Sequence, residues 1–311
     1  MLAYINAPLA IAPDPRQRAW AGSRLGGPGS GVGELWLAHG GSTVSDGPHA
    51  GRTLDELAEA HPYDLVGTRA TAAASGRFPL LAKLLDTAGW LSVQVHPDNA
   101  MAQRVEGPGA CGKSEAWLVV DAAPGAVVLT GVRPGVSGDQ IRASVGEEQL
   151  PELLSQERVA AGDAVDVPAR TIHALGPGLL VYEIQQPSDT TYRLHDWGRT
   201  GRALHVDLGR QALDAGRHAR VRRGGGRVDG TVITSASFAV DRLGVTPSGR
   251  ELAADHGSCR VLTVLDGEID LGDAPARRLE THATVVLPAA APALTMRAVG
   301  KRATVLVARV P

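Results

Sequence analysis

The sequence predicts a mainly β protein with a few short helices, and two observations support this. The 311 residues include 38 glycines and 20 prolines but only 4% aromatic residues, which is typical of a turn-rich chain whose core is built from Val, Leu and Ala. From Thr231 onward, turn residues separate alternating apolar segments roughly every ten positions, a pattern typical of a sandwich or small barrel. A chain of this length is expected to form two domains, or one large domain with appendages.

Charge and cysteine content exclude several classes of protein. Lys and Arg total 31 against 33 Asp and Glu, so no overall basic field favours nucleic-acid binding. Cys111 and Cys259 are too few for a disulfide framework and too far apart for a thiolate zinc site. The N-terminus lacks the pattern of a signal peptide, and no apolar run reaches about 18 residues. We expect a cytoplasmic protein that binds neither nucleic acid nor membrane, and the sequence predicts no specific protein partner.

The first part of the chain contains one predicted strand, one helix start and one apolar run. Residues 33–36 predict a short strand. Thr53 and Glu56 form a capping box, and the apolar residues after it predict a helix to about His61. The run FPLLAKLLD from Phe78 predicts a strand, in which Lys83 could simply extend its ammonium from an amphipathic surface into solvent.

The middle of the chain predicts further strands and a helical insertion near 137–159. WLVVDAAPGAVVLTGV gives two apolar runs joined by a hairpin turn at residues 122–125. Residues 137–145 and 147–159 have helical character, interrupted by Pro151. Strands are expected through Val165 and Val167 and at LLVYEIQ, residues 179–185.

The last third contains a weak helix, a linker and a series of strands. ALHVDLGRQALDA has weak helical periodicity. The Arg/Gly-rich run from Arg217 to Arg227 predicts a linker or exposed loop, which is more often a solvated surface than a nucleic-acid contact. Asp266 and Gly267 predict a hairpin turn between two of the strands that follow.

The segment LSVQVHPDNAMAQRVEGPGACGKSE, residues 91–115, predicts half of a metal site. Gln94 and His96 lie two positions apart, so on a strand both side chains project from the same face. Glu115 lies beyond a Gly/Pro-rich excursion and can return to meet them. An amide, an imidazole and a carboxylate suit zinc, manganese or iron better than an ion that prefers thiolates.

A second motif supplies the missing ligand. Gly162, five residues, Pro168, two residues and Thr171-Ile172-His173 have the spacing of the second cupin motif, in which the final histidine binds metal. With FPLLAKLLD, QVHP, GKSE and YEIQQPSDTTYRLHDWGR in this order, the chain resembles type I phosphomannose isomerases in their short bacterial form. The resemblance covers almost the whole sequence.

The resemblance implies a fold, a cofactor and an activity. The fold would be two cupin-type β-barrel (jelly-roll) domains with a few short helices inserted. Residues 1–205 would form the catalytic, metal-binding domain and residues 206–311 a degenerate cupin-like domain. The activity would be zinc-dependent interconversion of mannose 6-phosphate and fructose 6-phosphate through a cis-enediol, with a sugar phosphate as the small-molecule partner.

The resemblance also assigns roles to individual residues. One zinc ion per chain would be bound by Gln94, His96, Glu115 and His173. Lys113 and Arg193 match positive groups at the reacting end of the sugar, and Glu183 is an inward carboxylate. Three further residues match positions that bind substrate: Ser92, Lys83 and Arg199.

Several alternatives stay open at this stage. Either Lys113 or Glu183 could be the catalytic base, because one lies two positions before a metal ligand and the other needs no tuning to be unprotonated. The family usually has glycine where this chain has Arg170, so either the turn differs there or the arginine has been recruited toward the pocket. Rival functions are a non-catalytic cupin that binds sugar phosphate, a cupin isomerase for another phosphorylated sugar, and a cupin oxygenase.

Overall fold

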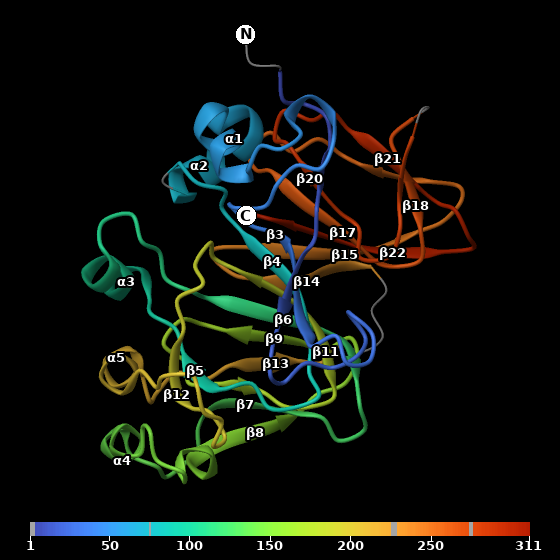
Figure 1. Ribbon diagram of the computed structural model, residues 1–311. Coiled ribbons are helices and arrows are strands. Elements are labelled where there is room, and N and C mark those ends of the chain that lie inside the picture. Colours follow the sequence, from blue (N-terminus) through green and yellow to red (C-terminus); the bar gives the residue numbers. More distant parts are fainter. Residues whose placement is uncertain (1–3, 75, 225–228, 274–275) are drawn as a thin grey trace. The chain divides into compact units, whose positions relative to one another are not determined.

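The computed structural model describes residues 4–74, 76–224, 229–273 and 276–311, which form two compact units (Figure 1). Unit 1 comprises residues 1–14, 36–83 and 226–311, and unit 2 comprises residues 15–35 and 84–225. The chain passes from one unit to the other inside strands β3 (Val32–Ala38) and β4 (Leu81–Asp86). The predicted strand at residues 33–36 is therefore confirmed and is longer than expected.

The strands of unit 2 belong to three sheets. The largest has the order β13-β9-β6-β11-β4-β3-β2, the second β10-β7-β8 and the third β12-β5. The remaining strand bounds are β2 (Asp14–Gln17), β5 (Val93–Val95), β6 (Glu115–Ala122), β7 (Val127–Val132), β8 (Leu154–Arg158), β9 (Ala164–Val167), β10 (Ala174–Leu175), β11 (Leu179–Gln185), β12 (Tyr192–His195) and β13 (Arg220–Arg222). The strands predicted at residues 165–167 and 179–185 are confirmed.

Two apolar cores of unit 2 lie on opposite faces of the β10-β7-β8 sheet. Val128 belongs to a cluster that includes Trp117 and Val165 of the large sheet. The next residue, Leu129, belongs to a second cluster with Val93 of β5 and Leu194 of β12. Because successive strand residues point to opposite faces, β7 is covered by apolar side chains on both sides.

Short helices complete unit 2. They are α3 (Asn99–Glu106), α4 (Gly138–Ala143), the 3₁₀ helix η3 (Leu150–Leu153) and α5 (Val206–Ala212). Ser137 and Gln140 form a capping box at the start of α4, which satisfies backbone N–H groups that a helix start leaves unpaired. The helical expectations for residues 137–145 and for ALHVDLGRQALDA are confirmed.

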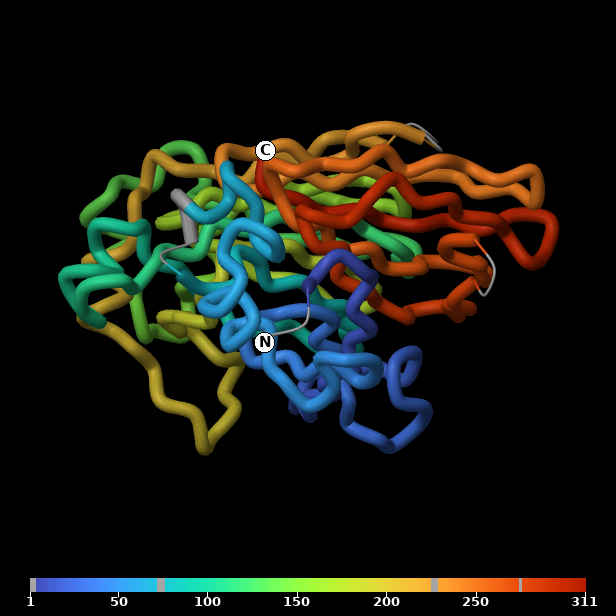
Figure 2. Tube along the Cα trace, turned by 90° about the horizontal axis from the view of Figure 1, so that it is seen from above, coloured from blue at the N-terminus to red at the C-terminus, as the bar shows by residue number. Residues whose placement is uncertain are grey.

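Unit 1 is a sandwich of a six-stranded and a four-stranded sheet. The orders are β1-β20-β17-β22-β15-β14 and β16-β21-β18-β19, and Figure 2 shows the orange and red strands side by side. A shared apolar core joins Val264 and Val305 of the first sheet to Ile269 and Met296 of the second. The strands are β1 (Leu9–Ile11), β14 (Gly230–Thr234), β15 (Ala239–Val245), β16 (Arg250–Leu252), β17 (Arg260–Asp266), β18 (Ile269–Leu271), β19 (Arg277–Leu279), β20 (Thr284–Leu287), β21 (Leu294–Ala298) and β22 (Ala303–Arg309).

The helices of unit 1 lie between residues 47 and 74. They are η1 (Gly47–His49), α1 (Leu54–Ala60), the π-helical segment η2 (Pro62–Val66) and α2 (Thr68–Ala74). The predicted capping box is present at α1, because the Thr53 hydroxyl accepts from the Glu56 N–H at 3.2 Å and the Glu56 carboxylate accepts from the Thr53 N–H at 2.9 Å. The helix ends at Ala60, which confirms the predicted end near His61.

The same pair of turns occurs once in each unit. In unit 2 a turn at residues 160–163, with Gly162 third, leads into β9, and a second turn starts at Pro168. In unit 1 a turn at residues 280–283, with His282 third, leads into β20, and a second turn starts at Pro288. The third residue of each first turn has positive φ, +90° for Gly162 and +69° for His282. The sequence alone did not reveal this repeat.

Two predicted hairpins are wrong, and both are corners between sheets. The turn after β6 leads into β7, but β6 lies in the large sheet and β7 in the β10-β7-β8 sheet. Likewise Asp266 and Gly267 connect β17 to β18, which belong to the two different sheets of unit 1. A turn signal between two strands predicts the reversal of the chain but not the partner of each strand.

Two other expectations also differ from the structure. Residues 154–158 form strand β8, paired with β7, and only residues 150–153 of the expected second helical stretch are helical. Arg220–Arg222 of the expected linker form the edge strand β13, paired with β9, while residues 225–227 lie outside the described part of the chain. The compact units are discontinuous in sequence, and the domains expected from the resemblance, residues 1–205 and 206–311, stay a prediction.

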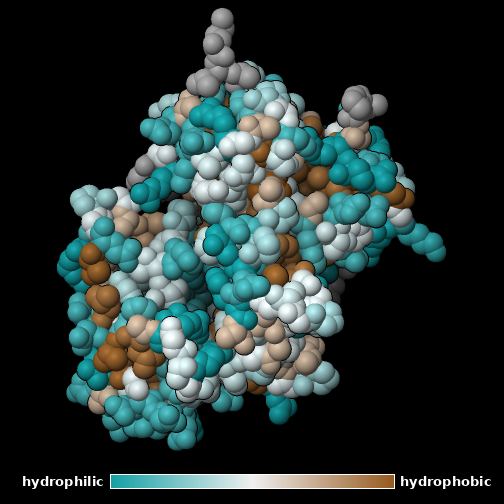
Figure 3. Space-filling view, viewed as in Figure 1, coloured by the Kyte–Doolittle hydropathy of each residue, from teal (hydrophilic) through white to brown (hydrophobic). Residues whose placement is uncertain are grey.

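The mainly β fold with few helices is confirmed, but closed barrels are not seen, because each sheet of the described strands has two edge strands. No helix in the described part of the chain has the length and apolar character needed to cross a membrane. On the face shown in Figure 3, hydrophobic residues form separate patches among hydrophilic ones.

Candidate metal centre

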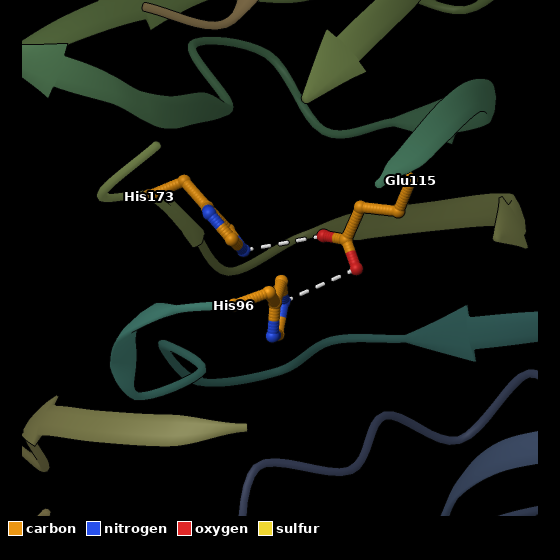
Figure 4. Close-up of side chains that lie close together, drawn as sticks. All are labelled: His96, Glu115 and His173. Carbon is orange, nitrogen blue, oxygen red and sulfur yellow. Dashed lines mark ion pairs between the residues drawn. The ribbon is translucent and has the colours of Figure 1, made fainter. Parts of the chain in front are cut away.

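Three buried side chains of unit 2 converge on one point (Figure 4). Glu115 Oε2 lies 3.2 Å from His96 Nε2, and Glu115 Oε1 lies 3.2 Å from His173 Nε2. None of the three residues is more than 2% exposed. The structure therefore brings together three of the four metal ligands that the sequence resemblance implied.

Strand pairing brings the three residues together. His96 directly follows β5, and the backbones of Gln94 and His173 exchange two hydrogen bonds of 3.0 Å. Glu115 is the first residue of β6 and pairs with Gln185 at the end of β11. Each ligand thus stands at or just beyond the end of a strand, where a rigid backbone limits its movement.

The fourth expected ligand, Gln94, also reaches the cluster. Its amide nitrogen lies 3.3 Å from His173 Nε2, and its oxygen accepts from the Ser92 hydroxyl at 3.2 Å. Oxygen and nitrogen of an amide exchange places by a half-turn of the group. In the turned position the oxygen would face the cluster and the nitrogen could donate to Ser92.

The donor set fits a four-coordinate metal ion such as zinc. Ligand atoms bound at about 2.0 to 2.1 Å in a tetrahedron lie about 3.3 Å from one another. Each imidazole Nε2 lies 3.2 Å from its nearer Glu115 oxygen, and one ligand atom from each of the three residues lies within 4.8 Å of the others. Nitrogen and carboxylate oxygen ligands suit zinc and iron.

Both imidazoles are also oriented so that Nε2 could bind a metal ion. His96 Nδ1 lies 3.0 Å from the Thr190 carbonyl and His173 Nδ1 lies 2.8 Å from the Thr171 carbonyl. A carbonyl oxygen can only accept, so each ring donates from Nδ1, and in the neutral ring Nε2 keeps its lone pair. When both rings are neutral, two nitrogen lone pairs and a carboxylate point at one place, an arrangement that a cation stabilises.

The ammonium group of Lys113 places a positive charge next to this cluster. Its ammonium donates to Glu115 Oε2 and lies 3.1 Å from His96 Nε2. Burial, together with the Lys113 charge, lowers the pKa of His96 to about 3. Burial alone would raise the pKa of Glu115, but the Lys113 ammonium and the imidazoles outweigh it and hold that pKa well below its usual range. The cluster is therefore kept as neutral imidazole and charged carboxylate.

The loop that carries Lys113 is fixed against the start of α3. The Gly112 N–H donates to the Asn99 side chain at 2.8 Å, and the Lys113 N–H donates to the Pro97 carbonyl at 3.0 Å. A Cβ on Gly112 would lie 2.6 Å from the Asp98 carbonyl carbon. Only glycine allows the two backbones to approach this closely.

Glu183 lies on the same face of the large sheet as Glu115. Its Oε2 accepts a 2.9 Å hydrogen bond from the indole N–H of Trp117, its partner across the β6 and β11 pair. The Trp117 ring meets the His173 ring edge-on, with 5.6 Å between centroids. Trp117 thus links the predicted base Glu183 to a predicted ligand. Sequence reasoning did not single it out, although its position two residues after Glu115 places it on the same strand face.

Arg193 lies on the same strand face as Gln94. The two residues are opposite each other in the β12 and β5 pair, so their side chains leave the same side of the sheet. Its guanidinium donates to the Ala203 carbonyl at 3.0 Å, while its Nε is buried without a hydrogen-bond partner among the described residues. Burial lowers the pKa of Arg193, as does the neighbouring Arg202 charge.

The three predicted substrate-binding residues have different surroundings. The Ser92 hydroxyl donates to Gln94, next to the cluster. Arg199 donates to the Trp90 carbonyl at 2.8 Å and to Asp196 at 2.7 Å. Lys83 belongs to unit 1, is only 4% exposed and lies 5.3 Å from the Trp36 ring centroid, so it does not extend into solvent.

The chain resembles known phosphomannose isomerases in sequence. Residues 28–110 match the family model described as the catalytic domain of type I phosphomannose isomerase. A mannose-6-phosphate isomerase of Streptococcus mutans is 39% identical over 227 residues, 68% of this chain and 69% of the relative. A mannose-6-phosphate isomerase of Bacillus subtilis is 38% identical over 201 residues, 62% of each chain.

The fold agrees as well. The crystal structure of the mannose 6-phosphate isomerase from Bacillus subtilis superposes with a TM-score of 0.82 at 28% identity, covering 97% of this chain and 99% of the other. A putative mannosephosphate isomerase from Archaeoglobus fulgidus, 21% identical, shares the fold with a TM-score of 0.78 over 97% of each chain. Fold and site together define an enzyme of the isomerase class. The chain belongs to the type I phosphomannose isomerase family.

Proposed function

We propose that this protein is a zinc-dependent aldose–ketose isomerase that interconverts mannose 6-phosphate and fructose 6-phosphate. The observation that supports this most directly is the buried cluster of His96, Glu115 and His173, in which His96 is held neutral and Glu115 charged, in a member of this family. Zinc would be held by these three residues and by the Gln94 amide oxygen. When bound, zinc supplies Lewis-acid polarisation of a sugar oxygen.

The reaction requires a proton to move between two carbon atoms. A base removes the proton from C2 of the open-chain aldose, which gives a cis-enediol, and the same group returns a proton to C1. The O2 hydroxyl loses its proton as the C2 carbonyl forms, and O1 gains one. No atoms are added or lost, so a single base on one face of the enediol suffices.

Lys113 and Glu183 are the two candidates for this base. Lys113 directly contacts two of the proposed ligands, where a bound cation would lower its pKa toward the range of a base, whereas Glu183 is held one side chain away by Trp117. Arg193, which lies on the strand face of Gln94, would stabilise the negative charge that develops on O1 and O2. Ser92, Lys83 and Arg199 would bind the sugar phosphate.

Metal analysis combined with a coupled assay tests the proposed function. We expect about one zinc ion per chain and turnover with both mannose 6-phosphate and fructose 6-phosphate. His96→Ala and His173→Ala should each lose zinc and activity. A fully zinc-loaded wild-type protein with no turnover on either sugar would contradict the isomerase, and retention of zinc and activity in both variants would contradict the ligand assignment.

Solvent exchange distinguishes the two candidate bases. Lys113→Ala and Glu183→Gln are compared for exchange of the C2 proton with deuterated solvent, because only loss of the true base abolishes exchange. Arg193→Ala should keep zinc and the fold but lose most turnover. Normal kcat in that variant would remove Arg193 from the mechanism.

We further infer that both units derive from cupin-type jelly rolls, with residues 1–205 and 206–311 as the ancestral domains. The repeated pair of turns supports this, since Pro168 and Pro288 each begin a turn closed by a hydrogen bond from the third following residue. His173 follows the first of these turns, and Ala293 stands at the matching place after the second. The second unit therefore lacks this ligand, which agrees with its expected degenerate role.

A further inference from the structure

The turn before His173 has a conformation that normally requires glycine. The Thr171 N–H donates to the Pro168 carbonyl at 3.2 Å, and Arg170, the third residue of the turn, has a φ of +72°. A positive φ at this position alone is typical of a type II turn, in which glycine is strongly preferred. The arginine has therefore not changed the turn but occupies it in a strained conformation.

The side chain of Arg170 makes contacts that a glycine could not make. Its Nε donates to the carbonyl of Ala212, the last residue of α5, at 3.0 Å. Its terminal nitrogen lies 3.5 Å from Asp98. Asp98 is the N-cap of α3 and accepts from the Met101 N–H at 2.9 Å. One guanidinium thus connects the end of one helix to the start of another.

The backbone of Arg170 is tied to the metal cluster itself. Its N–H donates to the His96 carbonyl at 2.8 Å, and its own carbonyl accepts from the backbone N–H of Asp214 at 3.0 Å. The residue thus lies one hydrogen bond from the His96 backbone and three positions before His173. A change in the turn would move both imidazoles relative to Glu115.

We propose that Arg170 is a positioning residue for the metal centre: its side chain locks a strained turn so that His96 and His173 keep the spacing needed for metal. This inference rests on the proposed function, since it assumes that these residues bind zinc. It predicts that the side-chain contacts of Arg170, and not the strain of the turn, sustain the affinity for zinc. A substitution that removes these contacts should weaken zinc binding whether or not it relieves the strain.

The decisive variants are Arg170→Gly and Arg170→Ala, examined for zinc affinity by competition with a chromogenic chelator and for Tm without metal. Arg170→Gly removes the side-chain contacts but also the strain, so its metal-free Tm should stay within about 2 °C of wild type. Arg170→Ala keeps the strain, so its Tm should fall by more. Both should bind zinc about tenfold more weakly.

Asp98→Asn tests the contact to α3 separately. Asparagine still caps the helix but removes the charge that faces Arg170. We expect a smaller loss of zinc affinity, and in combination with Arg170→Gly no further loss, because both changes break the same link. Fully additive losses would contradict the link between the two residues.

His282→Gly is the matched control. His282 is also the third residue of a turn with positive φ, closed by a 2.9 Å hydrogen bond between Ala283 and Glu280, but it lies in unit 1. The zinc affinity of the His282→Gly variant should equal that of wild type. Equal weakening in His282→Gly would mean a general effect of turn flexibility and would overturn the inference.

The outcomes separate this inference from the proposed function. If wild type binds no zinc, the proposed metal centre fails and this inference fails with it. If wild type binds zinc and the zinc affinity of Arg170→Gly is within twofold of the wild-type value, only the positioning role is wrong. A drop in the metal-free Tm of Arg170→Gly as large as that of Arg170→Ala would likewise contradict it.

Discussion

At the scale of single residues, the main feature of the site is the control of protonation. His96 and His173 each direct Nδ1 at a backbone carbonyl, and Lys113 keeps a positive charge beside Glu115. His96 is therefore held neutral and Glu115 charged before any cation binds, which lowers the cost of binding one at neutral pH.

The lowered pKa of His96 predicts a loss of stability in acid. Its pKa is about 3 in the folded protein and near its ordinary value of 6.5 when unfolded, so between these values the unfolded chain binds one more proton. The free energy of unfolding of the metal-free protein should therefore fall as pH drops below 6.5, by up to about 1.4 kcal/mol per pH unit from this residue. Urea unfolding at several pH values between 7 and 4 measures this change in the free energy of unfolding.

His96→Gln provides the reference for this measurement. Glutamine does not titrate, so the variant should show a shallower dependence of unfolding free energy on pH than wild type across that range. The other histidines are present in both proteins, so the difference in slope isolates the contribution of His96. Identical slopes would show that His96 is not the group held neutral.

Sequence reasoning predicted the residues that form the buried cluster but not the groups that support them. Gln94 and His96 were predicted from a two-residue spacing, which a strand converts directly into a shared face. Trp117 and the carbonyls of Thr171 and Thr190 were not predicted. No residue type at any spacing indicates which backbone carbonyl accepts a hydrogen bond from an imidazole. Arg170 was noticed only as an exception in its turn.

At the scale of elements, the site depends on the close approach of the Lys113 loop to the start of α3. Gly112→Ala should displace this loop, because the added Cβ would lie 2.6 Å from the Asp98 carbonyl carbon. Lys113 would then be misplaced, and we expect kcat to fall by about tenfold or more in a steady-state assay. Gly300→Ala is the control, because no atom lies within 4 Å of its added Cβ. Equal kcat in the two variants would contradict the prediction.

Helix α1 offers a prediction that involves no site residue. Thr53→Ala removes the hydroxyl that caps the helix and breaks the capping box. The free energy of unfolding should fall by about 1 kcal/mol, measured by urea denaturation, while kcat and KM stay at wild-type values. Thr53→Ser keeps the hydroxyl and should restore most of the stability. An unchanged midpoint for Thr53→Ala would mean that the cap contributes nothing.

Turns were predicted more reliably than strand partners. The reversals after β6 and after β17 are present, yet each leads into another sheet. A local signal such as Pro124-Gly125 or Asp266-Gly267 determines that the chain turns. Whether the next strand pairs with the previous one depends on which face must be buried, and that is a property of the assembled core.

At the scale of the whole molecule, bound metal should stabilise the fold. The proposed ligands come from segments far apart in the chain, Gln94 and His96, Glu115, and His173, so an ion that binds them favours the folded state alone. With free zinc at a hundredfold excess over Kd, the free energy of unfolding should rise by about 2.7 kcal/mol.

Differential scanning calorimetry with zinc and with chelator measures this effect. Tm of the wild type should fall on chelation, and Tm of His173→Ala should be the same in both conditions. The prediction is wrong if the wild type melts at one temperature with and without zinc, or if His173→Ala responds like the wild type.

The sequence by itself determined the class of fold, most of the helices and strands, and the residues of the buried cluster, because these depend on local spacing and on residue chemistry. Tertiary structure decided which strands pair, that Lys83 is buried, and that the sheets remain open. It also decided that Arg170 adopts a positive φ and joins two helix ends. These features arise from contacts between segments distant in the chain, and no local sequence pattern shows which distant segment will pack against a given strand.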